Sequence, residues 1–176
     1  MLFTADSIWT MLHGIVLGGG ALMGLAATLF CLRFMASSPG ADATARQSAA
    51  VAALTVFVAV ALWATVIGGT YIVFPPYRVP PPDGLVDLAA YPRAFLLGNP
   101  DTAWLHAFAM ETKEHVPWIA AMIATAVAFV ALRNRSTLLD DPRIRAMVTT
   151  LTAISFVLTA YVAVLGVFVN KVAPLE

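Results

Sequence analysis

Four long apolar runs constrain this chain more than any other feature of its sequence. They cover approximately residues 8–34, 47–74, 103–132 and 145–170. A helix needs about 20 predominantly apolar residues to cross the hydrocarbon core of a bilayer, and each run reaches this length. The sequence therefore predicts an all-α integral membrane protein, in which a four-helix bundle forms a single membrane domain over residues 1–176.

The composition argues against most soluble functions. Apolar types make up 60% of the 176 residues, charged types make up 11%, and the formal net charge is zero. A soluble domain carries about 25% charged residues, and one core could not bury this much apolar surface. A nucleic-acid partner is not expected because the chain has no basic tail. Cys31 is the single cysteine, so an intrachain disulfide is excluded, and we interpret it as a small apolar residue.

The distribution of basic residues predicts how the bundle crosses the membrane. The two short loops that follow the first and third runs hold six arginines, and the opposite side holds four basic residues. Because cytoplasmic loops carry the excess of Lys and Arg, we expect both termini and the long loop 75–101 on the extracytoplasmic side. The first run is too long for a signal peptide and has no basic residue before it, so we expect it to be retained as a span. The expected location is a bacterial inner (cytoplasmic) membrane.

Proline marks two further features. The loop 75–101 contains seven prolines, a composition that favours stiff extended segments over helix. This loop either caps a site or docks a partner, or it is a rigid spacer. In the third run, an amphipathic stretch over 102–115 leads into the apolar part, and Pro117 at the join predicts a kink or a break.

The three histidines are the strongest functional candidates, because ionisable residues within a span are costly. His13 lies in the first run, and His106 and His115 flank the start of the third. Counted at ~1.5 Å per residue from Arg33 and Arg133, His13 and His115 lie about 30 Å and 27 Å along their helices. They are therefore level within one turn, whereas His106, at roughly 40 Å, is expected outside the hydrocarbon.

The two histidines of the third run are expected on opposite faces of their helix. At ~100° per residue, the nine positions between them give about 900° of rotation. His115 shares its face with Glu111, and His106 shares the other face with Lys113. One ligand is therefore not expected to contact both histidines. A metal site made by His106, Glu111 and His115 would require the helix to break at Pro117.

Glycines lie near the level of His13 and His115 in the other three runs. Glycine permits close approach either of two helices or of a flat ligand, and both interpretations remain open. For His13, a hydrogen bond between helices is the simpler alternative to ligand binding. The glycines concerned are Gly14, Gly18, Gly68, Gly69 and Gly166.

Two imidazoles from two helices of a bundle satisfy the axial positions of a six-coordinate haem b. With four spans and the pair His13 and His115, the chain resembles small four-helix membrane cytochromes of the b type, including membrane subunits of quinone-linked respiratory complexes. The resemblance is architectural and leaves out the proline-rich loop. It implies one haem b near the extracytoplasmic face, with His13 and His115 as axial ligands. It also implies electron transfer, within a larger complex, between the quinone pool and a partner such as an extracytoplasmic cytochrome c.

Other residues have candidate supporting roles under this hypothesis. Glu111 lies one turn before His115 and could relay a proton or bind a quinol hydroxyl. Arg78 and Lys113 are candidate partners for haem propionates. His106 is either an interfacial histidine or part of a second site for haem or quinone. The competing hypothesis is a cofactor-free subunit that scaffolds a respiratory or photosynthetic complex, and a visible absorption spectrum distinguishes the two.

Overall fold

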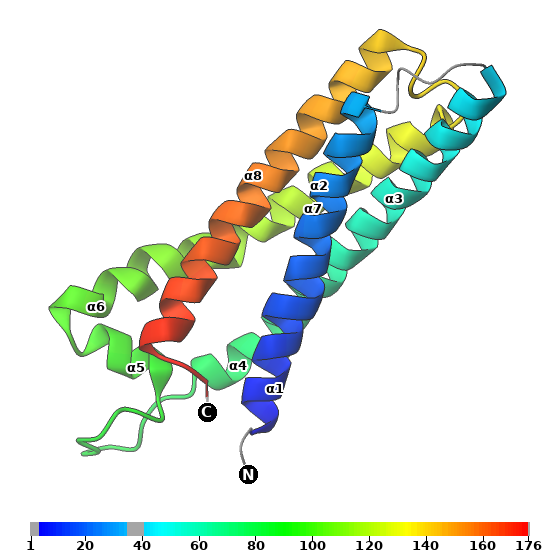
Figure 1. The fold of residues 1–176 in the computed structure, drawn as a ribbon. Helices are drawn as coiled ribbons and strands as arrows, with labels where there is room; N and C mark the ends of the chain where they lie inside the picture. Colours follow the sequence, from blue (N-terminus) through cyan, green and yellow to red (C-terminus); the bar gives the residue numbers. More distant parts are fainter. Residues whose placement is uncertain (1–3, 35–40, 176) are drawn as a thin grey trace.

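The computed structural model describes residues 4–34 and 41–175, and every regular element within these residues is helical. Four helices are long and apolar enough to cross a membrane: Ala5–Phe34, Thr44–Tyr77, Pro100–Arg133 and Pro142–Val172, numbered here as spans 1 to 4. The predicted all-α fold with four spans is therefore confirmed. Both ends of the chain lie at one end of the bundle, called here the terminal end (Figure 1). The connection 134–141 lies at the opposite, hairpin end, together with the end of span 1 and the start of span 2.

Three of the spans change their helix type on the way to the terminal end. Each contains a segment of π-helix, which has one more residue per turn than an α-helix. Span 1 consists of α1 (Ala5–Met11), η1 (Leu12–Gly18) and α2 (Gly19–Phe34). Span 2 lies within α3 (Ala41–Gly68), η3 (Gly69–Val73) and α4 (Phe74–Tyr77). Span 3 consists of α6 (Pro100–Trp104), η4 (Leu105–Met110) and α7 (Glu111–Arg133), and span 4 is α8 (Pro142–Val172).

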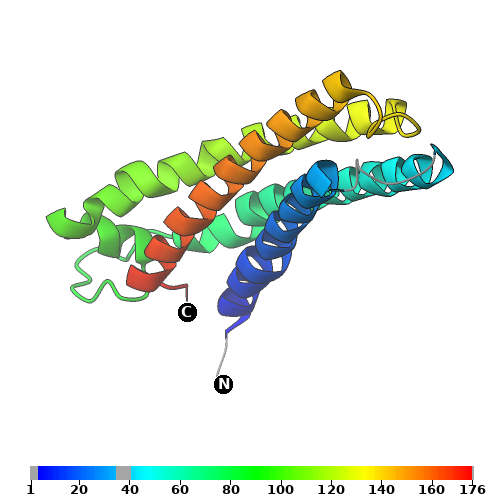
Figure 2. The same ribbon diagram turned by 45° about the horizontal axis from the view of Figure 1, so that its top comes forward.

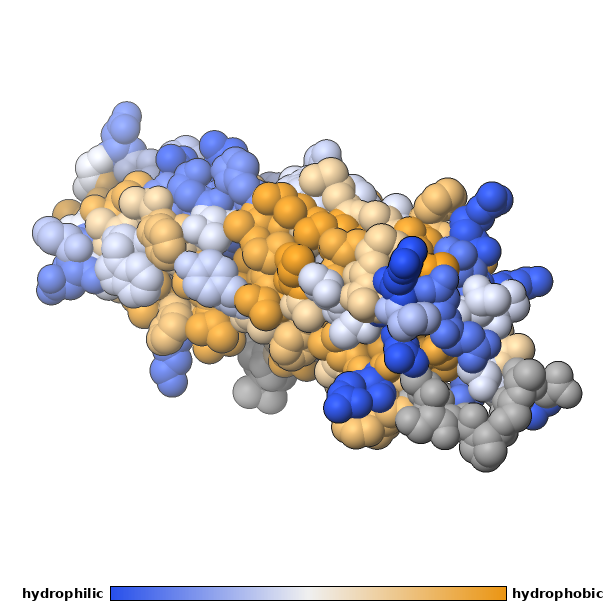
Figure 3. All heavy atoms as spheres, turned by 90° about the horizontal axis from the view of Figure 1, so that it is seen from above, coloured by the Kyte–Doolittle hydropathy of each residue, from blue (hydrophilic) through white to orange (hydrophobic). Residues whose placement is uncertain are grey.

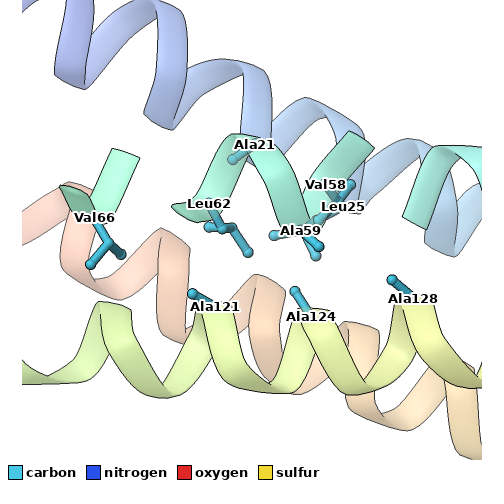
Figure 4. Close-up of a cluster of buried hydrophobic side chains, with 9 residues drawn as sticks. All are labelled: Ala21, Leu25, Val58, Ala59, Leu62, Val66, Ala121, Ala124 and Ala128. Atoms are coloured by element: carbon cyan, nitrogen blue, oxygen red, sulfur yellow. The ribbon is translucent and has the colours of Figure 1, made fainter. Parts of the chain in front are cut away.

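Small side chains allow the helices of the core to approach closely. Figure 4 shows Ala121, Ala124 and Ala128 of α7 facing Leu62 and other apolar side chains of α2 and α3. In lipid, helix association depends on such close van der Waals packing, because the surrounding acyl chains are as apolar as leucine. One polar contact in this region crosses between helices, where Trp63 Nε1 donates to Thr125 Oγ1 at 2.9 Å.

The outside of the bundle matches a membrane environment. Figure 3 shows hydrophobic residues across the middle of one face and hydrophilic residues gathered toward the two ends. Large exposed apolar side chains include Ile15, Met23, Phe30, Val60 and Phe129. A soluble monomer rarely exposes such a continuous apolar surface, so contact with lipid is its natural environment.

The proline-rich loop contains more helix than its composition predicts. Its first residues belong to α4, and a separate helix, α5, runs over Pro92–Leu97. The expectation of extended structure fits only part of the loop, including Pro80, Pro81 and Pro82, which lie outside any helix. The reason is position: Pro92 and Pro100 each occupy the first turn of a helix, where a missing N–H costs nothing.

The structure also corrects the expectation of a break at Pro117. This residue lies inside α7, which continues without interruption from Glu111 to Arg133. Proline is tolerated within membrane helices because neighbouring helices and small local adjustments satisfy the freed backbone carbonyl. The irregular part of span 3 is instead η4, which ends before Glu111.

Candidate functional site

The π-helical segments of spans 1, 2 and 3 coincide with the polar residues of the terminal end. His13 lies in η1, Gly69 begins η3, and His106 lies in η4. Short π-helical segments are rare and are frequent at functional sites, because the extra residue changes the direction of the side chains around it. Three of them in one half of a bundle identify this half as the candidate site.

His13 is positioned by a glycine on the neighbouring span. A Cβ atom at Gly69 would lie only 2.6 Å from Cε1 of His13, so the imidazole occupies the space that a side chain at Gly69 would need. The main chain of Thr65, one turn earlier on the same helix, forms a hydrogen bond with the ring. Nδ1 of His13 is buried and has no hydrogen-bond partner. An unpaired nitrogen in an apolar interior is unfavourable, which makes it a candidate ligand-binding atom.

Lys113 lies between helices in a similar arrangement. A Cβ atom at Gly166 of α8 would lie 3.3 Å from Cε and 3.9 Å from Nζ of Lys113. The sequence suggested Lys113 as a partner for propionates near the surface, whereas the structure places its side chain against span 4.

The other glycines at this level contact protein atoms or nothing at all. A Cβ at Gly68 would meet Cδ1 of Leu17 at 3.9 Å, and one at Gly18 would meet the carbonyl oxygen of His13 at 3.3 Å. A Cβ at Gly14 would have no neighbour within 4 Å. Of the two open interpretations, the structure therefore shows close packing of spans 1 and 2 at Gly18, Gly68 and Gly69.

His106 forms a polar network that connects three elements. Its Nδ1 lies 3.0 Å from the hydroxyl oxygen of Tyr77 in α4, and its Nε2 accepts a hydrogen bond from Nε of Arg93 in α5 at 3.3 Å. A guanidinium only donates, so the proton of the neutral ring is on Nδ1 and points to the Tyr77 oxygen. Both ring nitrogens are therefore occupied, and His106 has no free nitrogen for a metal ion.

His115 is exposed on the outer face of α7. The helix face that carries His115 continues toward the hairpin end through Ile119 and Met122, whose side chains are 47% and 55% exposed. Its Nδ1 lies 2.7 Å from the main-chain oxygen of Glu111. A carbonyl oxygen only accepts, so Nδ1 donates the proton, and Nε2 of the neutral ring keeps a free lone pair. Metal-binding histidines commonly have this arrangement, in which one nitrogen is fixed by a carbonyl and the other binds the metal.

The structure separates the residues that the sequence grouped into one haem site. His13 faces span 2 at Gly69, whereas His115 and Glu111 are exposed on the outer face of span 3. The opposite faces expected for His106 and His115 agree with their contacts. Arg78 is exposed, and its guanidinium lies 5.2 Å from the centre of the Phe74 ring. The unpartnered ring nitrogen of His13 is buried, whereas the His115 ring is exposed, so the two candidate ligands lie in different surroundings.

The sequence did not show that Tyr77 and Arg93 contact His106, because the fold brings these three residues together from separate elements. The inward position of Lys113 has a signal in the sequence, because Lys113, Ala120, Ala124 and Ala131 lie along one stripe of small residues at helical spacing. Small residues mark the packed face of a membrane helix, and Lys113 continues that face.

Within the described residues, no group of three or more His, Cys, Asp or Glu side chains is arranged to hold a metal ion. No known protein family, curated protein or solved structure matches the chain. The geometry of the terminal half is therefore the basis on which function is argued.

Proposed function

We propose that the chain is a haem b-binding membrane subunit that carries electrons between the quinone pool and an extracytoplasmic redox partner within a larger complex. The observation that supports the proposal is the exposed His115, with Nδ1 fixed by the Glu111 carbonyl and Nε2 free. Haem, when bound, supplies the one-electron carrier. In this proposal the complex lies in a bacterial inner membrane.

The second axial ligand would come from outside this chain. His13 packs against Gly69, and both nitrogens of His106 are occupied by Tyr77 and Arg93. The exposed face around His115 is therefore the place where a partner subunit would complete the site. This modifies the expectation of an intrachain His13–His115 pair, and it keeps His115 as the ligand that this chain provides.

The same face supports assembly into a complex. Glu111 and His115 are exposed near the terminal end of a membrane span, together with Trp104 and Phe108. Ionisable side chains on a lipid-facing surface are unfavourable, and in membrane proteins they usually face other protein or a cavity. A partner subunit on this face would remove them from lipid. Glu111 would then be near the bound group as a proton carrier, and the exposed Arg78 would be available to a propionate.

Absorption spectra of the complex, purified in mild detergent from its native membrane, test this proposal. We expect a Soret band with a reduced-state α-band, lost in His115→Ala and kept in His106→Ala and His13→Ala. A spectrum that His115→Ala leaves unchanged would contradict the assignment of the ligand. A colourless wild-type complex would contradict haem binding altogether and favour the cofactor-free scaffold.

A further inference from the structure

A groove opens at the hairpin end, at the opposite end of the bundle from the three histidines. Its volume is about 460 Å³, within the range of ~300–1,000 Å³ that is typical of ligand sites. The last turn of α2 forms one wall of the groove and the first turns of α8 form the other (Figure 1). Its polar lining includes Arg33 from α2 and Arg145 from α8, so that the groove brings two guanidinium groups together from separate spans.

Both arginines have N–H donors left for a ligand. Nη1 of Arg145 donates to the main-chain oxygen of Leu139 at 2.9 Å, which holds the side chain at the start of α8 and leaves its other N–H groups free. The guanidinium of Arg33 lies 5.8 Å from the centre of the Phe34 ring. Within the described residues, no hydrogen bond engages Arg33, and no carboxylate forms an ion pair with either arginine.

The acidic residues of this end do not neutralise the groove. Oδ1 of Asp141 accepts hydrogen bonds from the main-chain nitrogens of Arg143 and Ile144, at 2.8 Å and 3.3 Å, and thereby caps α8. Neither Asp140 nor Asp141 lines the groove, whereas the exposed Thr150 does, and its hydroxyl has no partner in the part of the chain that the structure describes. The lining therefore presents two cations and a free hydroxyl without an anion.

This set of donors suits a phosphate group. Guanidinium groups bind phosphate oxygens through parallel N–H bonds, which is why arginine is preferred where phosphate is recognised. The choline group of a zwitterionic lipid would bring a positive charge close to both arginines. A ligand whose phosphate carries an uncompensated negative charge therefore fits the groove better.

The surroundings of the groove favour a lipid phosphate over a free one. Leu32, Pro142 and Ala146 give the groove an apolar part that a free phosphate would not use. The exposed Phe30 and Ile154 lie one helical turn further toward the middle of the bundle, on the helix faces of groove residues. Toward the hairpin end the apolar surface gives way to hydrophilic residues (Figure 3), as at the boundary between acyl chains and headgroups.

We propose that this groove binds the headgroup of an anionic phospholipid. Arg33 and Arg145 donate to the phosphate oxygens, Thr150 adds a hydroxyl, and the acyl chains lie along the exposed apolar side chains of α2 and α8. The bound lipid would connect the end of span 1 to the start of span 4, which the chain itself does not join. The inference goes beyond the proposed function, because neither arginine belongs to the candidate haem site.

Native mass spectrometry of the full chain in detergent tests the site by counting bound lipids. The probe is phosphatidylglycerol, and phosphatidylcholine with the same acyl chains is the reference. We expect one phosphatidylglycerol to bind at least about tenfold more tightly than phosphatidylcholine. Arg33→Gln and Arg145→Gln should each weaken phosphatidylglycerol binding by about tenfold, as expected when a charge-assisted hydrogen bond is lost.

Arg143→Gln is the matched control, because Arg143 is exposed near Arg145 on α8 and does not line the groove. Its affinity for phosphatidylglycerol should equal that of the wild type. Arg33 is exposed and makes no hydrogen bond within the described residues, so Arg33→Gln keeps the test informative if Arg145→Gln, which loses the contact with Leu139, does not fold.

Melting temperatures in the same detergent give a second measurement, since a ligand of the folded state raises them. Phosphatidylglycerol should raise the melting temperature of the wild type and of Arg143→Gln more than that of Arg33→Gln. Equal losses of binding in Arg143→Gln and Arg33→Gln would overturn the site, because the charge of the whole hairpin end would then attract the lipid. Equal affinities for the two lipids, or the same stabilisation by inorganic phosphate alone, would overturn the assignment of an anionic lipid.

Discussion

At the level of single residues, the contrast between Gly69 and Gly14 gives a direct test of the packing around His13. A Cβ at Gly69 would overlap the imidazole, whereas one at Gly14 would have no neighbour within 4 Å. We expect Gly69→Ala to lower the free energy of unfolding by about 1–3 kcal/mol, the usual cost of overpacking. Gly14→Ala should be neutral or slightly stabilising, because alanine is the better helix former.

Thermal unfolding of the detergent-solubilised protein measures this difference. The double variant His13→Ala with Gly69→Ala should recover part of the lost stability, because the smaller side chain removes the overlap. Equal melting temperatures for Gly69→Ala and Gly14→Ala would show that the imidazole does not occupy the Gly69 position.

The candidate residues could be selected from the sequence, but their directions could not. Helical spacing correctly separated His106 from His115 on the third span. It gives angles only relative to the helix's own axis, however, and which angle faces the interior depends on how the neighbouring helices pack. His115 was therefore assigned to the interior, which Lys113 in fact faces. For the same reason, the sequence indicated a close approach at Gly69 but did not indicate that the approaching group is His13.

At the level of elements, the Tyr77–His106–Arg93 network holds the end of span 2 and the helix α5 against span 3. The phenol ring is buried and stacks on Phe74, with ring centres 5.8 Å apart. Because these contacts come from three separate elements, they fix the loop 78–91 at both of its ends.

Tyr77→Phe should therefore weaken the attachment of α5 and of the end of span 2 to span 3, without disturbing the spans themselves. Loss of the hydroxyl leaves Nδ1–H of His106 without its acceptor, at a cost of about 1–3 kcal/mol. Hydrogen exchange at the amides of 93–97 should become faster in Tyr77→Phe. Tyr71→Phe is the matched control, since Tyr71 is 69% exposed, and its exchange pattern should equal that of the wild type. Unchanged protection in Tyr77→Phe would mean that the network does not hold α5.

The helices themselves were predictable and their irregularities were not. Long apolar runs define the spans because a bilayer demands hydrogen-bonded backbone over a fixed length. Pro117 was expected to kink or break span 3, and α7 continues through it without a break. The π-helical turns at Leu12–Gly18, Gly69–Val73 and Leu105–Met110 have no comparable signal, because they depend on tertiary contacts.

At the level of the whole molecule, the orientation in the membrane follows from the arginine-rich hairpin end and remains a prediction. Val86 is 94% exposed in the loop 78–91, and Ser136 is exposed in the turn between α7 and α8. These two positions lie at opposite ends of the bundle, so that single cysteines there report the two sides of the membrane.

In a Cys31→Ser background, Val86→Cys should react with a membrane-impermeant maleimide added to intact cells. Ser136→Cys should react only after the membrane is permeabilised, because the positive-inside bias places it in the cytoplasm. The Cys31→Ser chain without added cysteines gives the background. The reverse labelling pattern would invert the topology and place the site on the cytoplasmic side.

The π-helical segments also make the bundle adjustable in a way that a regular bundle is not. A π turn contains one residue more than an α turn, so that deleting one residue within Leu105–Met110 lets the chain close as ordinary α-helix. Everything on the terminal side would then keep its direction relative to α7, whereas the same deletion in a regular α-helix would rotate it by ~100° about the helix axis. Trp104 and the loop before it would keep their neighbours, and the alanine core would stay as it is. The π-helical segments are thus places at which such a membrane protein can lose one residue without redirecting the rest of its spans.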